Sequence, residues 1–332
     1  DEKLKVTVKN FYHNGIGRYN RTGIPQYGRT ERGDLLTGNF ILEEDLLDDR
    51  NSFVDPPHPF QPEFVKLAEL LANAGFTTIK RIDSSMGYLP GYEQDKPVTI
   101  KILSPILQRY APGRKSLKVF DSPNAAHSLT VNGHSITLRV DYKNARILLT
   151  GDLNKESQKN LLAAGLDPAE LLSDVAKACH HGSDKIDPNF MAKIAARATI
   201  FSSGDNEGHA HPRPIALGMA GFYGRPFQDL QGKFLPPLVY STELARSTEV
   251  SQPSKVKSEG NPSELEPHLF DVKLKDQKFY QGLESRWVLS DLVYGMINVR
   301  TDGNWILTGF RLEENNSFNI NVMVAGKDGV IR

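Results

Sequence analysis

The chain of 332 residues, with a mass of 37.0 kDa, is long enough for one large domain and one smaller unit. Apolar residues make up 39% and charged residues 24% of the chain, and its mean hydropathy is -0.41, which excludes a wholly disordered or fibrous protein. Lys plus Arg and Asp plus Glu number 40 each, so the chain has no net positive field to hold nucleic acid. A local basic groove is still compatible with this balance.

Cysteine count and hydropathy exclude further classes of protein. The single cysteine, Cys179, rules out an internal disulfide framework and a structural zinc site built from several thiolates, so any metal must bind to His and carboxylates. No run approaches the roughly 18 consecutive apolar residues of a membrane span, and residues 1–5 lack the hydrophobic run of a secretory signal. We therefore expect a soluble chain without a targeting signal, which favours the cytoplasm.

The first third of the chain combines a long loop with regular elements. Residues 4–11 alternate like a strand, and the Gly- and Arg-rich residues 14–38 indicate a long loop of the kind that serves a site. Residues 63–74 repeat apolar side chains with helical spacing and predict an amphipathic helix. A β-branched run predicts a strand at 98–103, and the following residues, to about residue 111, have the pattern of a short helix.

The central third alternates strands with helices, which indicates a layered α/β domain. Strands are expected at 134–140, 146–149, 175–179 and 198–202, the first two joined in a hairpin by a turn at 143–144. Helices are expected at 155–164 and 189–196.

The composition changes near residue 224. Residues 241–267 are rich in Ser, Glu, Lys and Pro, which predicts a flexible insertion or linker. Alternating apolar runs follow at 293–299, 305–311 and 318–324, so we expect a small β-rich C-terminal unit. The predicted organisation is a domain over 1–224, a linker over 225–268 and the β-rich unit over 269–332.

Six of the nine histidines fall within 85 positions, and these are His127, His134, His180, His181, His209 and His211. Asp152 and His180 directly follow predicted strands, where layered α/β folds place their ligands. Zinc accepts neutral imidazole and carboxylate oxygen, so His134, Asp152 and His180 are competent ligands, and a bound metal would lower the pKa of a coordinated water. The alternative is that each histidine lies at the surface or makes an ordinary hydrogen bond, the commoner role of a lone histidine.

Three runs, at residues 132–142, 147–153 and 177–183, carry a resemblance to a known family. With the Thr-Gly-Asp of the second run and the His-His-Gly-Ser of the third, they resemble the metallo-β-lactamase fold, and within it the hydrolase domain of ComEC-type competence proteins and their soluble relatives. The similarity extends over about residues 98–218. It implies a metallo-β-lactamase-like αββα sandwich, followed here by the β-rich C-terminal unit.

The resemblance also assigns roles to particular residues. It implies that Asp152 bridges two divalent ions, zinc or alternatively manganese, that His134 is a further metal ligand, and that His180 is the last ligand, with His181 as the alternative. His211 would contact the leaving group or a phosphate oxygen, or it would be only a turn histidine before a proline.

Other polar residues have supporting roles at most. Ser183 and Asn132 are expected to be turn residues or residues that support the ligands, rather than catalytic ones. His127 and His209 have no counterpart in the family. His13 could be proposed as a replacement ligand, but we expect it to be an exposed loop histidine.

The chain departs from the family at one important point. The family's main metal cluster, a His-x-His-x-Asp-His run, is absent from the sequence. Its place would be upstream of residue 1, because residues 11–16 resemble family sequence that follows this cluster. Either the sequence is an incomplete piece of a longer protein, which we favour, or the protein has lost half of its ligands.

The resemblance implies a metal-dependent hydrolase that acts on phosphodiester bonds, including those of nucleic acid, through a metal-activated water. Four arginines of the predicted loop either steer an anionic substrate or form a solvated surface, and these are Arg18, Arg21, Arg29 and Arg32. One alternative keeps the metals but changes the bond to an ester, lactone, thioester or amide. Another is a non-catalytic binding scaffold, whose aromatic residues Trp287, Tyr294 and Trp305 either form a binding surface or fill a core.

Overall fold

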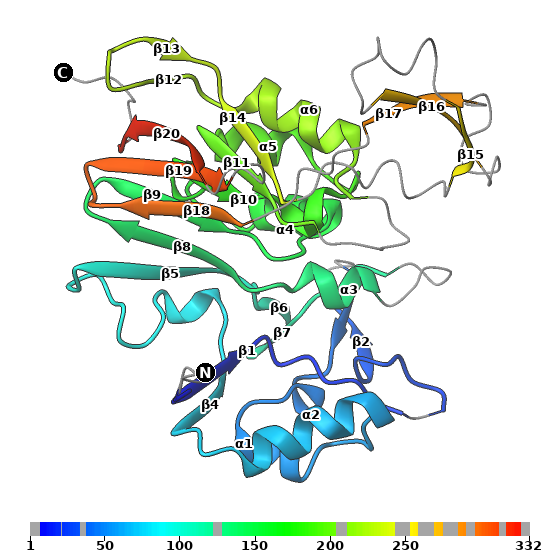
Figure 1. Cartoon of the computed structure of the whole chain (residues 1–332). Helices are drawn as coiled ribbons and strands as arrows, with labels where there is room; N and C mark the ends of the chain where they lie inside the picture. Colours follow the sequence, from blue (N-terminus) through cyan, green and yellow to red (C-terminus); the bar gives the residue numbers. More distant parts are fainter. Residues whose placement is uncertain are drawn as a thin grey trace. The chain divides into compact units, whose positions relative to one another are not determined.

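The computed structural model describes residues 7–20, 22–33, 38–121, 128–203, 211–242, 296–311 and 317–326, and the strands at 253–257, 269–274 and 285–289. The fold is mixed α/β, with a central mixed sheet and a small β-rich part toward the C-terminus (Figure 1). The chain divides into two compact units, one made of residues 1–141 and 148–170 and the other of residues 142–147 and 171–332. None of the helices in the described part of the chain has both the length and the apolar character that a membrane crossing requires.

The N-terminal part of the first unit packs two helices against a two-stranded parallel sheet. Strand β1 (Asn10–His13) pairs with β4 (Thr78–Arg81), and α1 (Arg50–Val54) lies beside α2 (Pro62–Asn73), as Figure 1 shows. Proline is tolerated at the first position of α2 because that N–H has no partner within a helix. Apolar side chains from these elements form one core, and these are Tyr19, Leu47, Phe53, Ala68, Leu71 and Ile79.

Arg50 closes the C-terminal end of α2. Its Nη1 donates to the carbonyl oxygens of Leu71 (3.1 Å), Ala72 (2.6 Å) and Ala74 (3.1 Å). Its Nη2 donates to the carbonyl of Phe76 at 2.7 Å. The last carbonyls of a helix have no partner within the helix, so one guanidinium satisfies several acceptors here.

We expect the Arg50→Met variant to lose about 1–3 kcal/mol of unfolding free energy, because it leaves these carbonyls without a charged donor. Arg50→Lys should recover only part of the loss, since an ammonium cannot reproduce the planar fork of donors. Urea denaturation measures both effects. The matched control is Lys66→Met, an exposed position on α2, and an equal loss in Arg50→Met and this control would contradict the prediction.

The rest of the first unit is built from short hairpins, single strands and two more helices. Strand β2 (Thr30–Arg32) pairs antiparallel with β3 (Asn39–Ile41), and β6 (Gln108–Ala111) pairs antiparallel with β7 (Arg114–Ser116). The remaining elements are β5 (Val98–Ser104), α3 (Ser128–Gly133), β8 (Thr137–Tyr142) and α4 (Lys155–Ala163). The turn after β8 leads into β9 (Ala145–Leu149), with Lys143 in a left-handed conformation (φ 51°).

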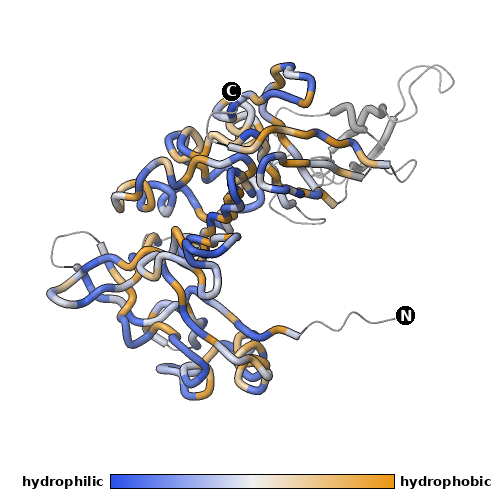
Figure 2. The backbone as a smooth tube through the Cα atoms, turned by 90° about the vertical axis from the view of Figure 1, so that its left-hand side faces the viewer, coloured by the Kyte–Doolittle hydropathy of each residue, from blue (hydrophilic) through white to orange (hydrophobic). Residues whose placement is uncertain are grey.

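Parallel strands and two helices form the α/β part of the second unit. Strands β10 (Val175–Lys177), β11 (Ala198–Phe201) and β14 (Leu238–Ser241) are neighbours and run parallel. The helices are α5 (Pro188–Ile194) and α6 (Pro214–Tyr223), and a short ladder joins β12 (Phe227–Gln228) to β13 (Phe234–Leu235). Figure 2 shows hydrophobic residues interleaved with hydrophilic ones along much of the described backbone, as expected when one face of each element is buried.

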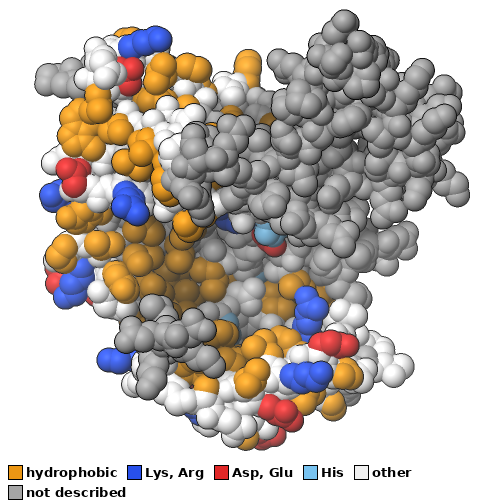
Figure 3. Space-filling view, in the orientation of Figure 1, with side chains coloured by type: hydrophobic (Ala, Val, Ile, Leu, Met, Phe, Trp, Pro, Cys, Tyr) orange, Lys and Arg blue, Asp and Glu red, His pale blue; other side chains and the backbone are white. Residues whose placement is uncertain are grey.

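The β-rich part of the second unit consists of two antiparallel three-stranded sheets. One contains β15 (Pro253–Lys257), β16 (Leu269–Leu274) and β17 (Ser285–Leu289), and the other contains β18 (Ile297–Thr301), β19 (Trp305–Arg311) and β20 (Phe318–Val324). Ile306 and Met323 of the second sheet are fully buried and pack in one core with Ala198 of β11. Trp305, Phe318 and Ile320 of this sheet are exposed. Figure 3 shows that hydrophobic side chains gather on the face of the molecule in view.

Several sequence predictions are confirmed. The strands predicted at 98–103, 146–149, 198–202, 305–311 and 318–324 correspond to β5, β9, β11, β19 and β20. The helices predicted at 63–74, 155–164 and 189–196 correspond to α2, α4 and α5. The αββα arrangement and the domain boundaries near residues 224 and 268 stay predictions.

Other predictions were wrong. The first strand starts at Asn10 rather than at residue 4, and the predicted loop 14–38 contains β2. Residues 108–111 form a strand instead of a helix, because they pair with β7 across a turn in which Gly113 has a φ of 73°. The strand predicted from residue 134 starts at Thr137, because residues 134–136 form the turn that leads from the end of α3 into β8. The predicted linker over residues 225–268 contains β12, β13, β14 and β15, while residues 243–252 and 258–268 lie outside the described residues.

Candidate functional site

The C-terminal ends of three parallel strands meet at one edge of the second unit. The registers Val175↔Ala198 and Ala198↔Leu238 align β10, β11 and β14, so the residues that follow them lie side by side. His180 and His181 follow β10, Ser202 and Ser203 follow β11, and Ser241 and Thr242 end β14. Parallel sheets bind ligands at this edge, because loops there carry polar groups past the ends of the strands.

The turn after β10 holds its histidines in an uncommon backbone conformation. His180 (φ 43°, ψ 52°) and His181 (φ 53°, ψ 16°) are both left-handed, and Gly182 follows with a φ of 87°. A Cβ at Gly182 would lie 2.5 Å from the ring of Phe201 and 2.6 Å from Cβ of Pro212, so only glycine allows this close approach. Left-handed non-glycine residues cost about 1–3 kcal/mol each and cluster at functional sites.

Three imidazoles come together around this turn. The ring centroids of His180 and His211 are 5.5 Å apart, and those of His180 and His181 are 6.4 Å apart. His211, three residues before the start of α6, is buried. The Nδ1 of His181 donates to the carbonyl oxygen of Ser202, so in the neutral ring the lone pair lies on Nε2. The structure therefore places the ring of His180 next to that of His211 and next to that of His181.

His134 and Asp152 belong to the first unit. His134 follows α3 and is buried, its Nε2 donates to the carbonyl of Lys118 at 2.7 Å, and its ring lies 4.9 Å from that of Phe120. Burial lowers the pKa of His134 to about 4, so the ring is neutral at pH 7 and its lone pair lies on Nδ1.

Asp152 is held close to the chain segment that carries His134. Its backbone N–H donates to Oγ of Ser135, the residue after His134, at 2.9 Å. The preceding Gly151 has a φ of 57°, and a Cβ there would lie 2.6 Å from Cβ of Ser135. Ser104 completes the contact, because its Oγ donates to the carbonyl of Ser135 at 2.7 Å. The two predicted ligands of the first unit thus lie on adjoining backbone segments.

The predicted ligands are divided between the two units, with His134 and Asp152 in the first and His180, His181 and His211 in the second. Among the residues that the structure describes, no group of three or more His, Cys, Asp or Glu side chains is placed to hold a metal ion. The assignment of metal ligands stays a prediction.

Three residues considered at or near the site have structural places in the fold. His13 lies at the end of β1 rather than in an exposed loop, and its Nδ1 accepts from the backbone N–H of Gly15 at 3.1 Å. Burial and the charge of Arg81 lower the pKa of His13 to about 4. Ser183 is a buried turn residue whose Oγ accepts from the N–H of Lys185 at 3.2 Å, and Asn132 lies within α3.

The predicted arginine and aromatic groups are only partly described. Arg18 and Arg32 are exposed, as a solvated surface requires, and Trp305 is 36% exposed, so it does not fill a core. The remaining predicted positions lie outside the residues whose side chains are described, and these are Arg21, His127, His209, Trp287 and Tyr294.

Arg29 pairs with a buried carboxylate, a contact that the sequence did not reveal. Its Nη2 donates to Oδ1 of Asp45 at 2.6 Å, and Nε2 of His58 lies 2.9 Å from Oδ2 of the same carboxylate. Asp45 is fully buried, and although burial opposes its charge, hydrogen bonds from Arg29 and His58 hold its pKa below the ordinary value. The ion pair with Asp45 therefore holds Arg29 within the predicted loop. The sequence contains no local pattern for these contacts, because the residues that meet lie far apart along the chain.

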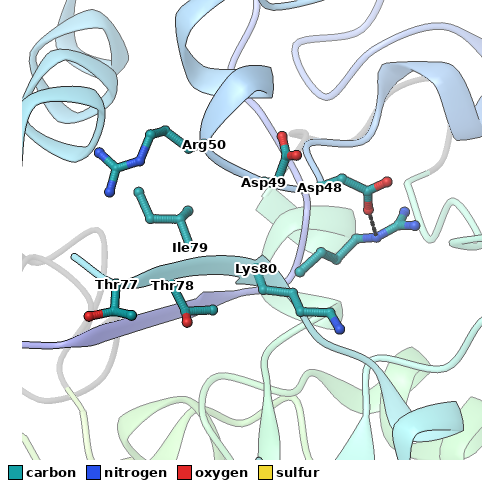
Figure 4. A pocket seen from close by; sticks show the side chains of 8 residues that line it. Asp48, Asp49, Arg50, Thr77, Thr78, Ile79 and Lys80 are labelled. Carbon is teal, nitrogen blue, oxygen red and sulfur yellow. Dashed lines mark ion pairs between the residues drawn. The ribbon is translucent and has the colours of Figure 1, made fainter.

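A cavity of about 440 Å³ in the first unit lies apart from the predicted site residues. Its lining comes from β4 and from the chain leading into α1, as Figure 4 shows, and consists of Asp48, Asp49, Arg50, Thr77, Thr78, Ile79, Lys80 and Arg81. Nε of Arg81 pairs with Oδ1 of Asp48 at 2.8 Å, and Arg50 is bound to the end of α2. Arg50, Arg81 and Asp48 of this lining thus have partners within the protein.

Comparison with known proteins gives one distant relationship. No family model matches the chain, and no solved structure matches it. A stretch of 97 residues, which is 29% of this chain and 12% of the relative, is 30% identical to ComE operon protein 3 of Bacillus subtilis (strain 168). The matched stretch thus spans about an eighth of the length of that relative. The chain is distantly similar to ComE operon protein 3.

Proposed function

We propose that the protein is a metal-dependent hydrolase that cleaves phosphodiester bonds, including those of nucleic acid, through a metal-activated water. The observation that carries this proposal is the group of imidazoles at the C-terminal edge of parallel strands, with His180 and His181 in a left-handed turn and the ring of His211 5.5 Å from that of His180. The distant similarity to ComE operon protein 3 supports the family resemblance from which the activity is inferred. A cytoplasmic location stays a prediction.

The proposed ligands are His134 and Asp152, together with His180 or His181. Their donor chemistry fits a divalent cation, because a ligating histidine is neutral and usually donates its other N–H to a backbone carbonyl. His134 and His181 both do so, through Lys118 and Ser202 respectively. When bound, zinc or manganese would supply a hydroxide at neutral pH and polarise the bond under attack.

The chain's own residues orient and protonate the reacting groups in this proposal. The Ser202 carbonyl fixes the ring orientation of His181 and keeps its proton on Nδ1. The hydrogen bond from the backbone N–H of Asp152 to Ser135 orients the segment that carries the carboxylate. His211, next to His180, is the donor of a proton to the leaving oxygen.

We expect His180→Ala to lower hydrolysis of bis(p-nitrophenyl) phosphate, with zinc or manganese added, at least tenfold, because the variant removes an imidazole from the centre of the group. Bound metal per chain, measured by elemental analysis, should fall in parallel. Lys193→Ala, an exposed position on α5, is the matched control and should retain both properties. Circular dichroism verifies that each variant is folded.

Two outcomes would contradict the proposal. Turnover of nitrophenyl ester, lactone, thioester or β-lactam substrates without turnover of the phosphodiester would assign the protein to another class of metal-dependent hydrolase. Well under one ion per chain, with no response to zinc, manganese or chelator, would favour a non-catalytic binding scaffold.

A further inference from the structure

The hairpin of β6 and β7, in the first unit, carries charged side chains on both of its faces. On one face Tyr110 and Ser116 are buried, and the guanidinium carbon of Arg114 lies 5.1 Å from the centroid of the Tyr110 ring. Arg114 also pairs with Glu31 at 3.2 Å and with Glu44 at 2.9 Å. These two carboxylates thus have a cationic partner on the face that carries Tyr110.

The opposite face of the hairpin presents two cations, Arg109 of β6 and Lys115 of β7. They are direct cross-strand partners, and both side chains are exposed. Within the part of the chain that the structure describes, neither side chain has a hydrogen bond or an ion pair. Like charges that face each other across an antiparallel pair repel each other and destabilise the hairpin. A bound anion would relieve this repulsion.

The base of the hairpin is hydrogen-bonded to the segment that carries the predicted ligand His134. Before the hairpin, Oγ of Ser104 donates to the carbonyl oxygen of Ser135 at 2.7 Å. After the hairpin, the carbonyl oxygen of Lys118 accepts from Nε2 of His134 at 2.7 Å. Lys118 follows Lys115 by three residues, which span roughly 10 Å in an extended chain. The cations therefore lie where phosphates that neighbour a reacting phosphate can reach them.

We propose that Arg109 and Lys115 bind backbone phosphates of a nucleic-acid strand that neighbour the bond to be cleaved. This inference rests on the proposed function and adds to it two residues that select a polymeric substrate. Guanidinium and ammonium groups bind phosphate oxygens through charge-assisted hydrogen bonds. Such contacts fix the position of a strand without reading its bases, so we expect binding that depends on salt and not on sequence.

The test uses Arg109→Gln and Lys115→Gln, singly and together, in the whole 332-residue chain. The probe is a fluorescent single-stranded oligothymidylate with phosphorothioate linkages, which resists hydrolysis, and its anisotropy is recorded at several KCl concentrations without added metal. We expect each substitution to weaken binding about fivefold at low salt and to reduce the slope of log affinity against log salt by about 0.7, the value for one phosphate contact on a single strand. Lys66→Gln is the matched control, because Lys66 is an exposed lysine on α2 of the same unit, and it should change neither quantity.

Two further measurements distinguish phosphate binding from a structural role of the pair. Each substitution removes the repulsion between the two cations, so the urea midpoint of the variants should equal or exceed that of the wild type. With zinc or manganese added, kcat/KM for an unmodified oligothymidylate should fall through KM, and by about fivefold more than kcat/KM for bis(p-nitrophenyl) phosphate.

The outcomes separate this inference from the proposed function. Weaker binding with a shallower salt dependence supports the phosphate contact, even if the wild type hydrolyses no phosphodiester. A wild type that hydrolyses the diester, with variants that match it in affinity for the oligonucleotide, would overturn the contact and leave the proposed function standing. Failure of the wild type to bind the oligonucleotide, or equal weakening by Lys66→Gln, would also overturn it. So would displacement of the probe by thymidine monophosphate at the same phosphate concentration, because it would show a site for a single phosphate group.

Discussion

Replacing Arg197 with methionine is expected to remove about 3–5 kcal/mol from the unfolding free energy of the second unit, because the change leaves a buried carboxylate without its partner. Arg197 is fully buried, and its Nη1 lies 2.8 Å from Oδ1 of Asp174, which is itself only 2% exposed. Burial raises the pKa of Asp174 above its ordinary value despite the opposing charge of Arg197. Burying this charge is therefore costly even when it is paired, and more so once the guanidinium is gone.

Arg197 also joins the end of the C-terminal sheet to the parallel strands. Its Nη1 and Nη2 donate to the carbonyl oxygens of Val324 and Gly326, at the end of β20. The backbone N–H of Arg146 donates to the other carboxylate oxygen of Asp174 at 3.0 Å. Loss of Arg197 should thus lower the protection of β20 amides against hydrogen exchange more than that of β4 amides in the other unit.

A double-mutant cycle separates the ion pair from general disruption. Asp174→Asn alone should also be strongly destabilising, and the double variant with Arg197→Met should lose less than the sum of the single losses, because neither charge is then left alone. Arg300→Met, at an exposed position on β18, is the matched control and should stay within about 0.5 kcal/mol of the wild type. Additive single losses in urea denaturation would contradict this interpretation.

The sequence predicted elements well where a local pattern was long enough to be unambiguous. Helix α2 and strand β5 combine clear periodicity with proline boundaries, and their bounds differ from the prediction by one residue. The short helices α1 and α3 were missed because one or two turns contain too few apolar positions for a periodic signal. The strand at residues 108–111 could not be predicted, because its pairing with β7 depends on a register that no local pattern encodes.

The same distinction applies to the site. Asp152, His180 and His181 could be predicted because each follows a strand within a recognisable run of residues. The hydrogen bond between Oγ of Ser203 and Oγ of Ser241, at the same strand edge, could not be predicted, since the two residues lie 38 positions apart and meet only through the parallel register of β11 and β14. The sequence did contain a signal for the ion pair of Asp174 and Arg197, because each of these charged residues directly precedes a buried strand. Such a pattern identifies adjacent charges only after the strands are known to be neighbours.

Lowering the pH from about 7 to about 4 is expected to destabilise the first unit by roughly 3 kcal/mol through His13 alone. Burial, with a contribution from the charge of Arg81, lowers the pKa of His13 from 6.5 to about 4. Below pH 6.5 the unfolded chain binds a proton at this ring that the folded chain binds only near pH 4. The unfolded state therefore binds more protons within this window, and stability falls as the pH falls. Above pH 6.5 the ring of His13 is neutral in both the folded and the unfolded chain, so its protonation no longer lowers the unfolding free energy.

His13→Asn isolates the effect of this ring, because the side-chain oxygen of asparagine can accept the N–H of Gly15 as Nδ1 of His13 does. The unfolding free energy of the variant, measured by urea denaturation from pH 7 to pH 4, should decline less steeply than that of the wild type. The two curves should differ by roughly 3 kcal/mol more at pH 4 than at pH 7, since carboxylates titrate equally in both proteins. Parallel curves would show that His13 is protonated in the folded state and that burial does not lower its pKa.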